Sequence, residues 1–230
     1  MSKPLIIAVE GTDKAGKRTQ VTKIMSYLRA KGIASETLDF PQYNSFWGKE
    51  VKKYLNGEYG DIKNVPGELV MNLYANDRRN HQGLIHEWLD TGKWVVFDRY
   101  SYSNLFSVAK YPEELWDEKI AWLEEMEFVG SGLIRPDYNI YLYLDPNISY
   151  EMRFQGMKNY QNGKPDLHES NLKLLTDVSH VYNKVAQKDP ARWTVVDEMD
   201  GMRRLSIDEV FEKIRERLDQ LILDNARCAL

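Results

Sequence analysis

The chain has 230 residues, 43% of them hydrophobic and 29% charged, a balance that excludes a disordered segment and is typical of a folded domain. Its 31 basic and 35 acidic side chains give a formal charge of −4, which argues against a broad nucleic-acid footprint or an anionic-membrane surface. The single cysteine, Cys228, excludes a disulfide framework within the chain. We therefore expect one cytoplasmic domain over residues 1–230 that binds neither nucleic acid nor membrane.

Five short apolar runs have the length and composition of β-strands. In chain order they are residues 5–9, 35–40, 94–97, 138–144 and 193–196. All but the weakest, 35–40, lack regular polar alternation, which predicts strands buried on both faces of a sheet.

Apolar side chains recur at helical spacing between these strands. Val21, Ile24 and Leu28 follow the first run, and a longer stripe follows Ser206, which forms a capping box with Glu209. Strands that alternate with helices predict an α/β fold with a parallel sheet covered on both faces. Such a sheet binds ligands beyond the carboxyl ends of its strands.

A glycine-rich loop between the first strand and the first helix is the strongest chemical signal. It matches the pattern G-x-x-x-x-G-K from Gly11 to Lys17. Glycines let the backbone approach phosphate oxygens, and the helix N-terminus and the lysine add positive potential. The predicted ATP-phosphate site comprises Gly11, Asp13, Lys14, Ala15, Gly16, Lys17, Arg18 and Thr19.

The residue after the loop lysine departs from the usual motif. A serine or threonine normally stands there and reaches Mg²⁺, but this chain has Arg18, with a hydroxyl one place later at Thr19. We expect the ion to be held through waters and Asp98, with Thr19 as an alternative. Asp98 and Arg99 follow the strand at 94–97, where a carboxylate can organise magnesium and a guanidinium can clamp phosphate.

Several short motifs together resemble the thymidylate kinases, a branch of the P-loop nucleoside-monophosphate kinases. They are the loop at 10–20, Phe40-Pro41, Leu73-Tyr74 with Arg78, Asp98-Arg99-Tyr100 with Ser103, and Pro136-Asp137. The resemblance covers nearly the whole chain. It implies a five-stranded parallel sheet flanked by helices, a lid, a homodimer, and ATP-dependent phosphorylation of dTMP with Mg²⁺.

The resemblance also implies roles for residues on the donor side. Lys17 and the loop backbone would hold the ATP phosphates, and Lys14 stands where several relatives carry an arginine that stabilises the transferring group. Arg153 resembles the residue near the donor adenine at the start of the lid. The polar, turn-rich segment 156–167 would be that lid. The implied catalytic residues are Lys14, Lys17, Asp98 and Arg99, with Asp98 and Thr19 as metal ligands.

On the acceptor side, Asp13 would accept a hydrogen bond from the 3′-hydroxyl, and Arg99 would grip the acceptor phosphate. Tyr74 would stack on thymine, and Arg78, one helical turn later, would reach a base carbonyl. The implied substrate-binding residues are Asp13, Phe40, Tyr74, Arg78, Arg99, Ser103, Asn104 and Ser107.

Three positions depart from the family pattern and keep alternatives open. Besides Arg18, Tyr43 stands where many relatives have a phosphate-binding arginine, and Ser107 where many have an aromatic ring near the sugar. One alternative is therefore a kinase for dUMP or a modified deoxypyrimidine monophosphate. The other is a nucleotide-binding protein with impaired catalysis, against which the retained Lys17 and Arg99 argue.

Overall fold

The computed structural model describes residues 3–61, 64–152 and 171–227. In this part of the chain, five parallel strands form one sheet in the order β2-β3-β1-β4-β5. The strands are β1 (Ile6–Gly11), β2 (Ser35–Asp39), β3 (Trp94–Asp98), β4 (Tyr138–Tyr143) and β5 (Trp193–Asp197). The predicted five-stranded parallel sheet is confirmed, with strand ends one or two residues from those expected. The expected lid at 156–167 and Arg153 lie outside the described residues.

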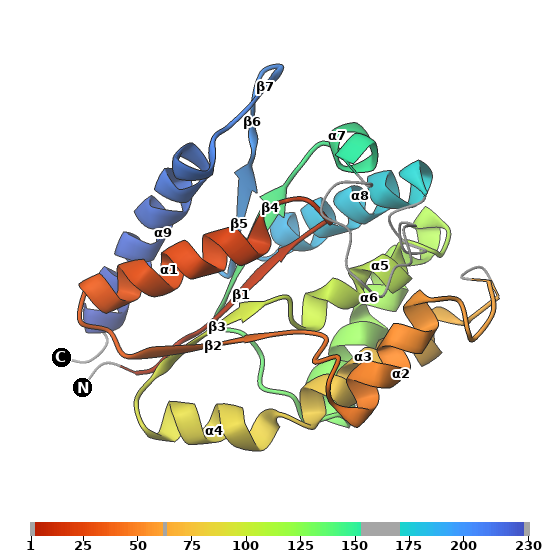
Figure 1. Ribbon diagram of the computed structural model, residues 1–230, viewed down its shortest axis with the longest axis horizontal. Helices are drawn as coiled ribbons and strands as arrows, with labels where there is room; N and C mark the ends of the chain where they lie inside the picture. Colours follow the sequence, from red (N-terminus) through yellow and green to blue (C-terminus); the bar gives the residue numbers. More distant parts are fainter. Residues whose placement is uncertain (1–2, 62–63, 153–170, 228–230) are drawn as a thin grey trace.

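Helices connect the strands and cover both faces of the sheet (Figure 1). They are α1 (Lys17–Ala30), α2 (Phe46–Leu55), α3 (Gly67–Arg79), α4 (Gln82–Asp90), α5 (Leu105–Val108), α6 (Trp116–Glu125), α7 (Pro146–Glu151), α8 (Leu172–Lys188) and α9 (Ile207–Arg227). Short 3₁₀ turns η1 (Ser101–Asn104) and η2 (Glu113–Leu115) and the π-helical η3 (Met126–Gly130) complete the set. No helix in the described residues is long and apolar enough to cross a membrane.

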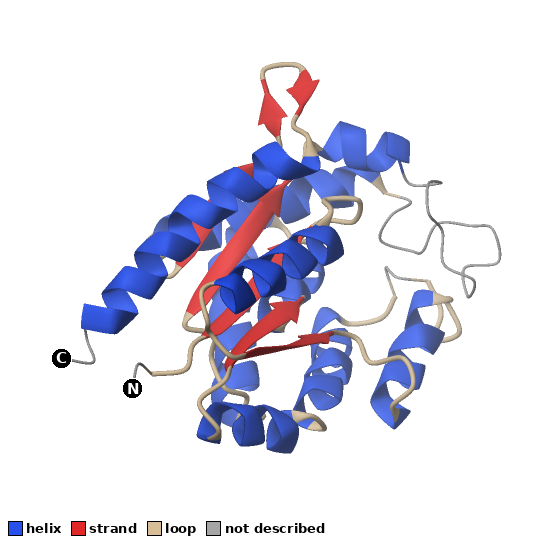
Figure 2. Cartoon of the chain, turned by 60° about the vertical axis from the view of Figure 1, so that its left-hand side comes forward, coloured by secondary structure: helices blue, strands red, loops and turns tan. Residues whose placement is uncertain are grey.

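Successive side chains along a strand point to opposite faces of the sheet, so the core has two layers. Ile7 and Val9 pack with α1 and α9 on one face, whereas Ile6 and Ala8 pack with α4 on the other. Towards β4 and β5, α8 covers that second face. Figure 2 shows the sheet between these helical layers. Because only residues 12–16 separate β1 from α1, this packing fixes both ends of the loop between them.

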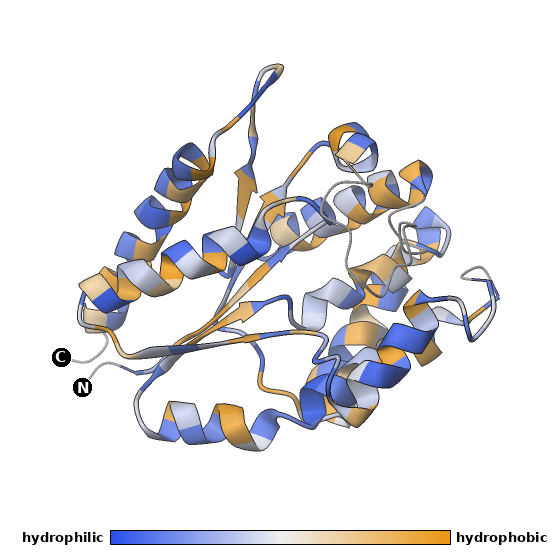
Figure 3. Cartoon of the chain, in the orientation of Figure 1, coloured by the Kyte–Doolittle hydropathy of each residue, from blue (hydrophilic) through white to orange (hydrophobic). Residues whose placement is uncertain are grey.

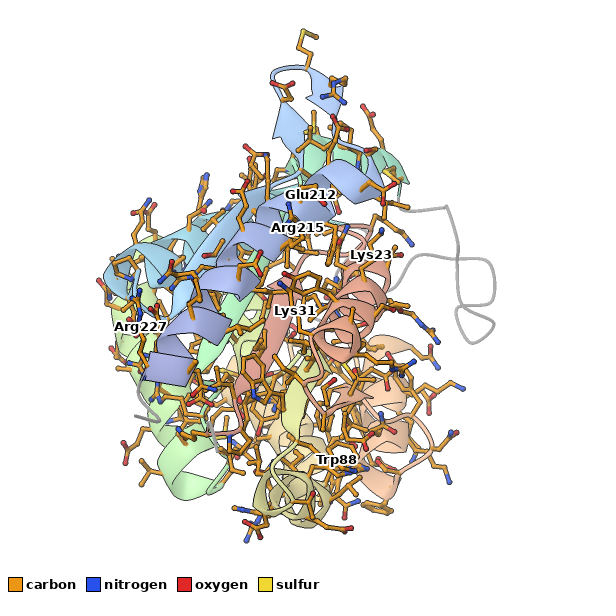
Figure 4. The ribbon with its side chains drawn as sticks, turned by 90° about the vertical axis from the view of Figure 1, so that its left-hand side faces the viewer. Lys23, Lys31, Trp88, Glu212, Arg215 and Arg227 are labelled. Atoms are coloured by element: carbon orange, nitrogen blue, oxygen red, sulfur yellow. The ribbon has the colours of Figure 1, made fainter. Side chains whose placement is uncertain are left out.

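Helices α1 and α9 each bury an apolar stripe and expose charged residues. Figure 3 shows hydrophilic and hydrophobic residues alternating along α9, as expected for a half-buried helix. The predicted capping box is confirmed, because Ser206 N donates to Glu209 (2.8 Å) and Glu209 N donates to Ser206 Oγ (3.3 Å). Lys31, directly after the last residue of α1, pairs with Asp219 of α9 at 3.2 Å. Figure 4 labels Lys31, together with Glu212 and Arg215 of α9.

The edges of the sheet differ from expectation. β5 was predicted to be buried on both faces, which is wrong because it is an edge strand, and Val195 is 42% exposed. β2, at the other edge, is also half-exposed. Beyond β5, the two-residue strands β6 (Met199–Asp200) and β7 (Arg203–Arg204) form a hairpin that projects from the body (Figures 1 and 2). Strands this short carry no periodic signal, and the sequence did not predict them.

Candidate active site

The loop after β1 needs glycine at two places for different reasons. A side chain at Gly11 would bring its Cβ within 2.7 Å of the Leu142 carbonyl oxygen on β4. Gly16 has a left-handed φ of 66°, which glycine adopts without steric cost. Lys14 adopts a similar φ of 67°, which is strained for a residue with a side chain. The loop thus passes close to β4 and enters α1 at Lys17, so that it lies between a strand and a helix as in a phosphate loop.

Lys17 lies buried at the start of α1. Its Nζ donates to the Thr12 carbonyl at 2.7 Å, inside the loop. Burial, reinforced by the Arg99 charge, lowers the pKa of Lys17 to about 8, although Asp13 and Asp98 act in the opposite direction. An anionic phosphate would restore the charge that burial disfavours.

Asp98 and Arg99 lie at the end of β3, beside this loop. In the sheet register, Asp98 is the partner of Val9 on one side and Asp39 on the other. Arg99 donates to the Gly11 carbonyl at 3.1 Å and pairs with Asp13 at 2.6 Å. Burial opposes its charge, but Asp13 and other anionic groups hold the pKa of Arg99 above its usual value. Arg99 also has a left-handed φ of 69°. Lys14 and Arg99, which both have this strained backbone, therefore lie at the same site.

Glu10 is a buried carboxylate beneath the site that the predicted set did not include. It accepts hydrogen bonds from Tyr100 N (2.8 Å), Ser103 Oγ (2.6 Å) and Tyr182 Oη (3.1 Å). Burial raises the pKa of Glu10, and the Ser103 hydroxyl opposes that rise most among the donors. Glu10 therefore joins the end of β3 to α8, and it shows that the Ser103 hydroxyl has a structural partner.

One cavity of about 500 Å³ joins the two strand ends to α3 and α5. It brings together most of the predicted residues: Asp13, Lys14, Gly16, Lys17, Arg18, Thr19, Phe40, Tyr74, Arg78, Asp98, Arg99, Ser103, Asn104 and Ser107. Gly11 and Ala15 do not line it, since Gly11 packs against β4 and Ala15 is buried behind the loop.

The cavity is also lined by residues that the sequence analysis did not predict as site residues. They are Asp39, Pro41, Tyr43, Leu55 and Phe106. Asp39 could have been found, because it ends a strand beside Asp98 and strand ends of a parallel sheet meet at one edge. Leu55 carries no such signal, since α2 reaches the cavity only through its packing on α3.

Arg78 enters the cavity from α3 but is itself 1% exposed. Its guanidinium forms a buried ion pair with Glu127 and donates to the Tyr100 carbonyl at 3.3 Å. Asn104 also contacts Glu127, through Nδ2 at 2.5 Å. The far end of the cavity is thus lined by polar groups that one buried carboxylate holds in place.

Within the described residues, no group of three or more His, Cys, Asp or Glu side chains could hold a metal ion. The predicted ligands Asp98 and Thr19 do line the same cavity. A parallel sheet, a glycine–lysine loop that enters a helix, and an Asp-Arg strand end at a shared cavity are together typical of P-loop nucleoside-monophosphate kinases.

Comparison with known proteins narrows this class. The family model described as thymidylate kinase matches residues 9–224, and the chain belongs to the thymidylate kinase family. It is 32% identical to the thymidylate kinase of Mycobacterium tuberculosis (strain CDC 1551 / Oshkosh), over 84% of this chain and 91% of that protein. The human thymidylate kinase is 28% identical over 91% of this chain and 87% of its own length.

A solved thymidylate kinase from Candida albicans has the same fold. Its TM-score is 0.72 at 21% identity, covering 98% of this chain and 94% of that one. The similarity confirms the expected P-loop kinase architecture.

Proposed function

We propose that this protein transfers the γ-phosphoryl group of ATP to dTMP, giving ADP and dTDP. The observation that carries the proposal is the single cavity that joins the phosphate loop to Tyr74 and Arg78. One end of it is cationic and suits phosphates, and the other has an aromatic ring and hydrogen-bonding groups suited to a base. Membership in the thymidylate kinase family supports the same acceptor.

In the proposed reaction, an oxygen of the dTMP phosphate attacks the γ-phosphorus of ATP in line. The bond from that phosphorus to the β–γ bridging oxygen breaks, and ADP leaves. Lys17, Lys14 and Arg99 would stabilise the charge on the transferring group, because positioned cations act strongly in a site that excludes water. Arg18 and the loop backbone of Gly11, Ala15 and Gly16 would complete the ATP-phosphate site, and Arg153 would lie near the adenine.

The residues at the cavity fit a magnesium ion bound with ATP. Mg²⁺ takes oxygen ligands and usually needs only one or two protein groups beside phosphates and waters. Asp98 supplies a carboxylate and Thr19 a hydroxyl at the cavity wall. When bound, the ion supplies positive charge that offsets the repulsion between the two nucleotides' phosphates.

On the acceptor side, Tyr74 and Phe40 offer aromatic surface to the base, and Arg78 and Asn104 offer hydrogen bonds. Asp13 would accept from the 3′-hydroxyl, Arg99 would bind the phosphate, and Ser103 and Ser107 would line the sugar. We extend the proposal to a homodimer, which the family resemblance supports. We also propose that the protein lies in the cytoplasm, and the single cysteine supports this location. A lid at 156–167 would exclude water during transfer.

The test is a coupled ADP-release assay on the purified chain with ATP, Mg²⁺ and a panel of monophosphates. We expect the highest kcat/KM for dTMP. Lys17→Ala and Arg99→Ala should each lower kcat/KM for dTMP by roughly 10²-fold or more. Such a loss would also exclude a contaminating kinase as the source of the activity. A higher kcat/KM for another monophosphate would reassign the acceptor. Binding of ATP and dTMP with no ADP formed would overturn the kinase assignment.

A further inference from the structure

Four successive carbonyls of the phosphate loop each accept a hydrogen bond from a side chain. From Gly11 to Lys14 the donors are Arg99 Nη1 (3.1 Å), Lys17 Nζ (2.7 Å), Ser149 Oγ (2.8 Å) and Arg204 Nη2 (2.8 Å). Lys17 and Arg99 line the cavity, whereas Ser149 of α7 and Arg204 of β7 do not. The last two have no part in the proposed reaction, so their contacts with the loop need another explanation.

The bonds from Ser149 and Arg204 orient two peptide groups of the loop. In a planar trans peptide, the carbonyl and the following N–H point in opposite directions. Arg204 holds the Lys14 carbonyl from outside the cavity and therefore turns the Ala15 N–H away from itself. Ser149 holds the Asp13 carbonyl and does the same for the Lys14 N–H. A loop binds phosphate when its N–H groups, and not its carbonyls, face the anion.

These two peptide groups flank the strained residue of the loop. Lys14 has a φ of 67°, and such a backbone persists only where the surroundings hold it. Ser149 is bonded to the peptide group before Lys14, and Arg204 to the one after it. Loss of either bond would let the loop relax towards an ordinary backbone, in which a carbonyl can face the phosphate.

Arg204 is itself held firmly at the base of the hairpin of β6 and β7. Its Nε and Nη2 donate to Oε2 of Glu198 at 3.2 and 2.8 Å, and its Nη1 lies 3.0 Å from Met152 Sδ. Glu198 is buried directly after β5, where its N–H donates to the Tyr143 carbonyl at 3.0 Å. Burial raises the pKa of Glu198, and the hydrogen bonds from Arg204 oppose the rise most. The hairpin therefore presents a fixed guanidinium to the loop.

We propose that Arg204 is a positioning residue for ATP, which holds the Lys14–Ala15 peptide so that the loop N–H groups face the phosphates, and that Ser149 supports it at the preceding peptide. The inference rests on the proposed function, because it takes the loop as the ATP-phosphate site. It also gives the hairpin of β6 and β7 a role in nucleotide binding.

The test measures the Kd for ADP and for dTMP by titration calorimetry, and the KM for ATP and for dTMP. In Arg204→Ala, fewer molecules have the loop in its binding orientation, so the Kd for ADP and the KM for ATP should rise about tenfold or more. Both constants for dTMP should stay unchanged. Ser149→Ala removes one hydroxyl with little change of shape, and should raise the Kd for ADP about fivefold.

The matched control is Arg203→Ala in the same hairpin. Arg203 is exposed and pairs with Asp200 (3.2 Å) and Glu209 (2.9 Å) at the surface, so its loss removes one positive charge without touching the loop. It should leave the Kd for ADP at the wild-type value. Equal losses of affinity for ADP and dTMP in Arg204→Ala would indicate a purely structural role and overturn the proposal, as would a wild-type Kd for ADP in both Arg204→Ala and Ser149→Ala.

A second measurement uses the nucleotide-free protein labelled with ¹⁵N. The Ala15 amide shares its peptide group with the Lys14 carbonyl, so its resonance should shift in Arg204→Ala and not in Arg203→Ala. If Arg204 instead touched ADP directly, the Ala15 resonance of the free protein would not change, and the proposal would be wrong. Wild type that binds ADP but does not phosphorylate dTMP would reject the proposed function alone, so the two failures are distinguishable.

Discussion

Individual cations at the phosphate end are held by anions and backbone carbonyls of the same loop. Lys17 donates to Thr12, and Arg99 bridges Gly11 and Asp13. The sequence predicted these residues because the G-x-x-x-x-G-K spacing and a strand-end Asp-Arg pair are local signals. It did not predict Glu10 or Glu127 as organising groups, because their partners lie up to 172 residues away and burial of a carboxylate has no local pattern.

The lowered pKa of Lys17 predicts a pH dependence for ATP binding. With a pKa of about 8, Lys17 is cationic in the free enzyme below that pH and loses its charge above it. The value of kcat/KM for ATP, which reports free-enzyme groups, should therefore be level to about pH 8 and then decline towards tenfold per unit. A profile from pH 6.5 to 9.5, compared with Lys17→Arg, checks this. A level profile to pH 9.5 in wild type would contradict it.

At the scale of elements, the loop between β2 and α2 is tied to α3. Buried Asp77 on α3 accepts from Gln42 N (2.7 Å) and Ser45 Oγ (2.6 Å), and Ser45 caps α2 by accepting from Gly48 N (2.8 Å). Pro41 and Tyr43 of this loop line the cavity, as do Tyr74 and Arg78 of α3. The sequence predicted most strands by their apolar runs, but not this attachment, because it depends on how α2 packs.

Gly48→Ala tests that attachment. An added Cβ would lie 1.9 Å from the Gln42 carbonyl oxygen, so the loop or α2 must move. We expect a loss of about 1–3 kcal/mol in the free energy of unfolding, as for overpacking, and a raised KM for dTMP with KM for ATP little changed. Denaturant unfolding and steady-state kinetics measure the two effects.

Gly83→Ala in α4 is the matched control, because nothing lies within 4 Å of its added Cβ. It should leave KM unchanged and stabilise the helix by about 0.5–1 kcal/mol. Equal behaviour of the two variants would show that contact with Gln42 has no consequence.

On the scale of the whole molecule, α1 and α9, which are far apart in the sequence, cover the same face of the sheet. The apolar stripes of α1 and α9 meet Ile7, Val9 and Leu142 in one core. Periodicity predicted both helices and a parallel sheet. The order β2-β3-β1-β4-β5 could not be read from periodicity, because strand neighbours depend on contacts between distant segments. The edge position of β5, and hence its exposure, follows from that order.

Leu218→Ala should weaken this core without touching the cavity. Leu218 is fully buried, and removing its side chain should cost about 2–5 kcal/mol of unfolding free energy. Leu223→Ala on the same helix is the control, since Leu223 is 54% exposed and should change stability by about 0.5 kcal/mol or less. Denaturant unfolding gives both values, and kcat/KM at a temperature where both variants stay folded should match wild type. Equal stabilities would refute the role of α9 as a core helix.

The left-handed backbone at Lys14 and Arg99 has a consequence for laboratory evolution. Each such residue costs about 1–3 kcal/mol, and glycine or asparagine would relieve much of it. A library selected for heat resistance alone should accumulate those replacements at these two codons, whereas a library that must also sustain growth through this enzyme should retain the lysine and the arginine. Sequencing the two populations would show, without any kinetic assay, at which positions thermal stability and catalytic activity favour different residues.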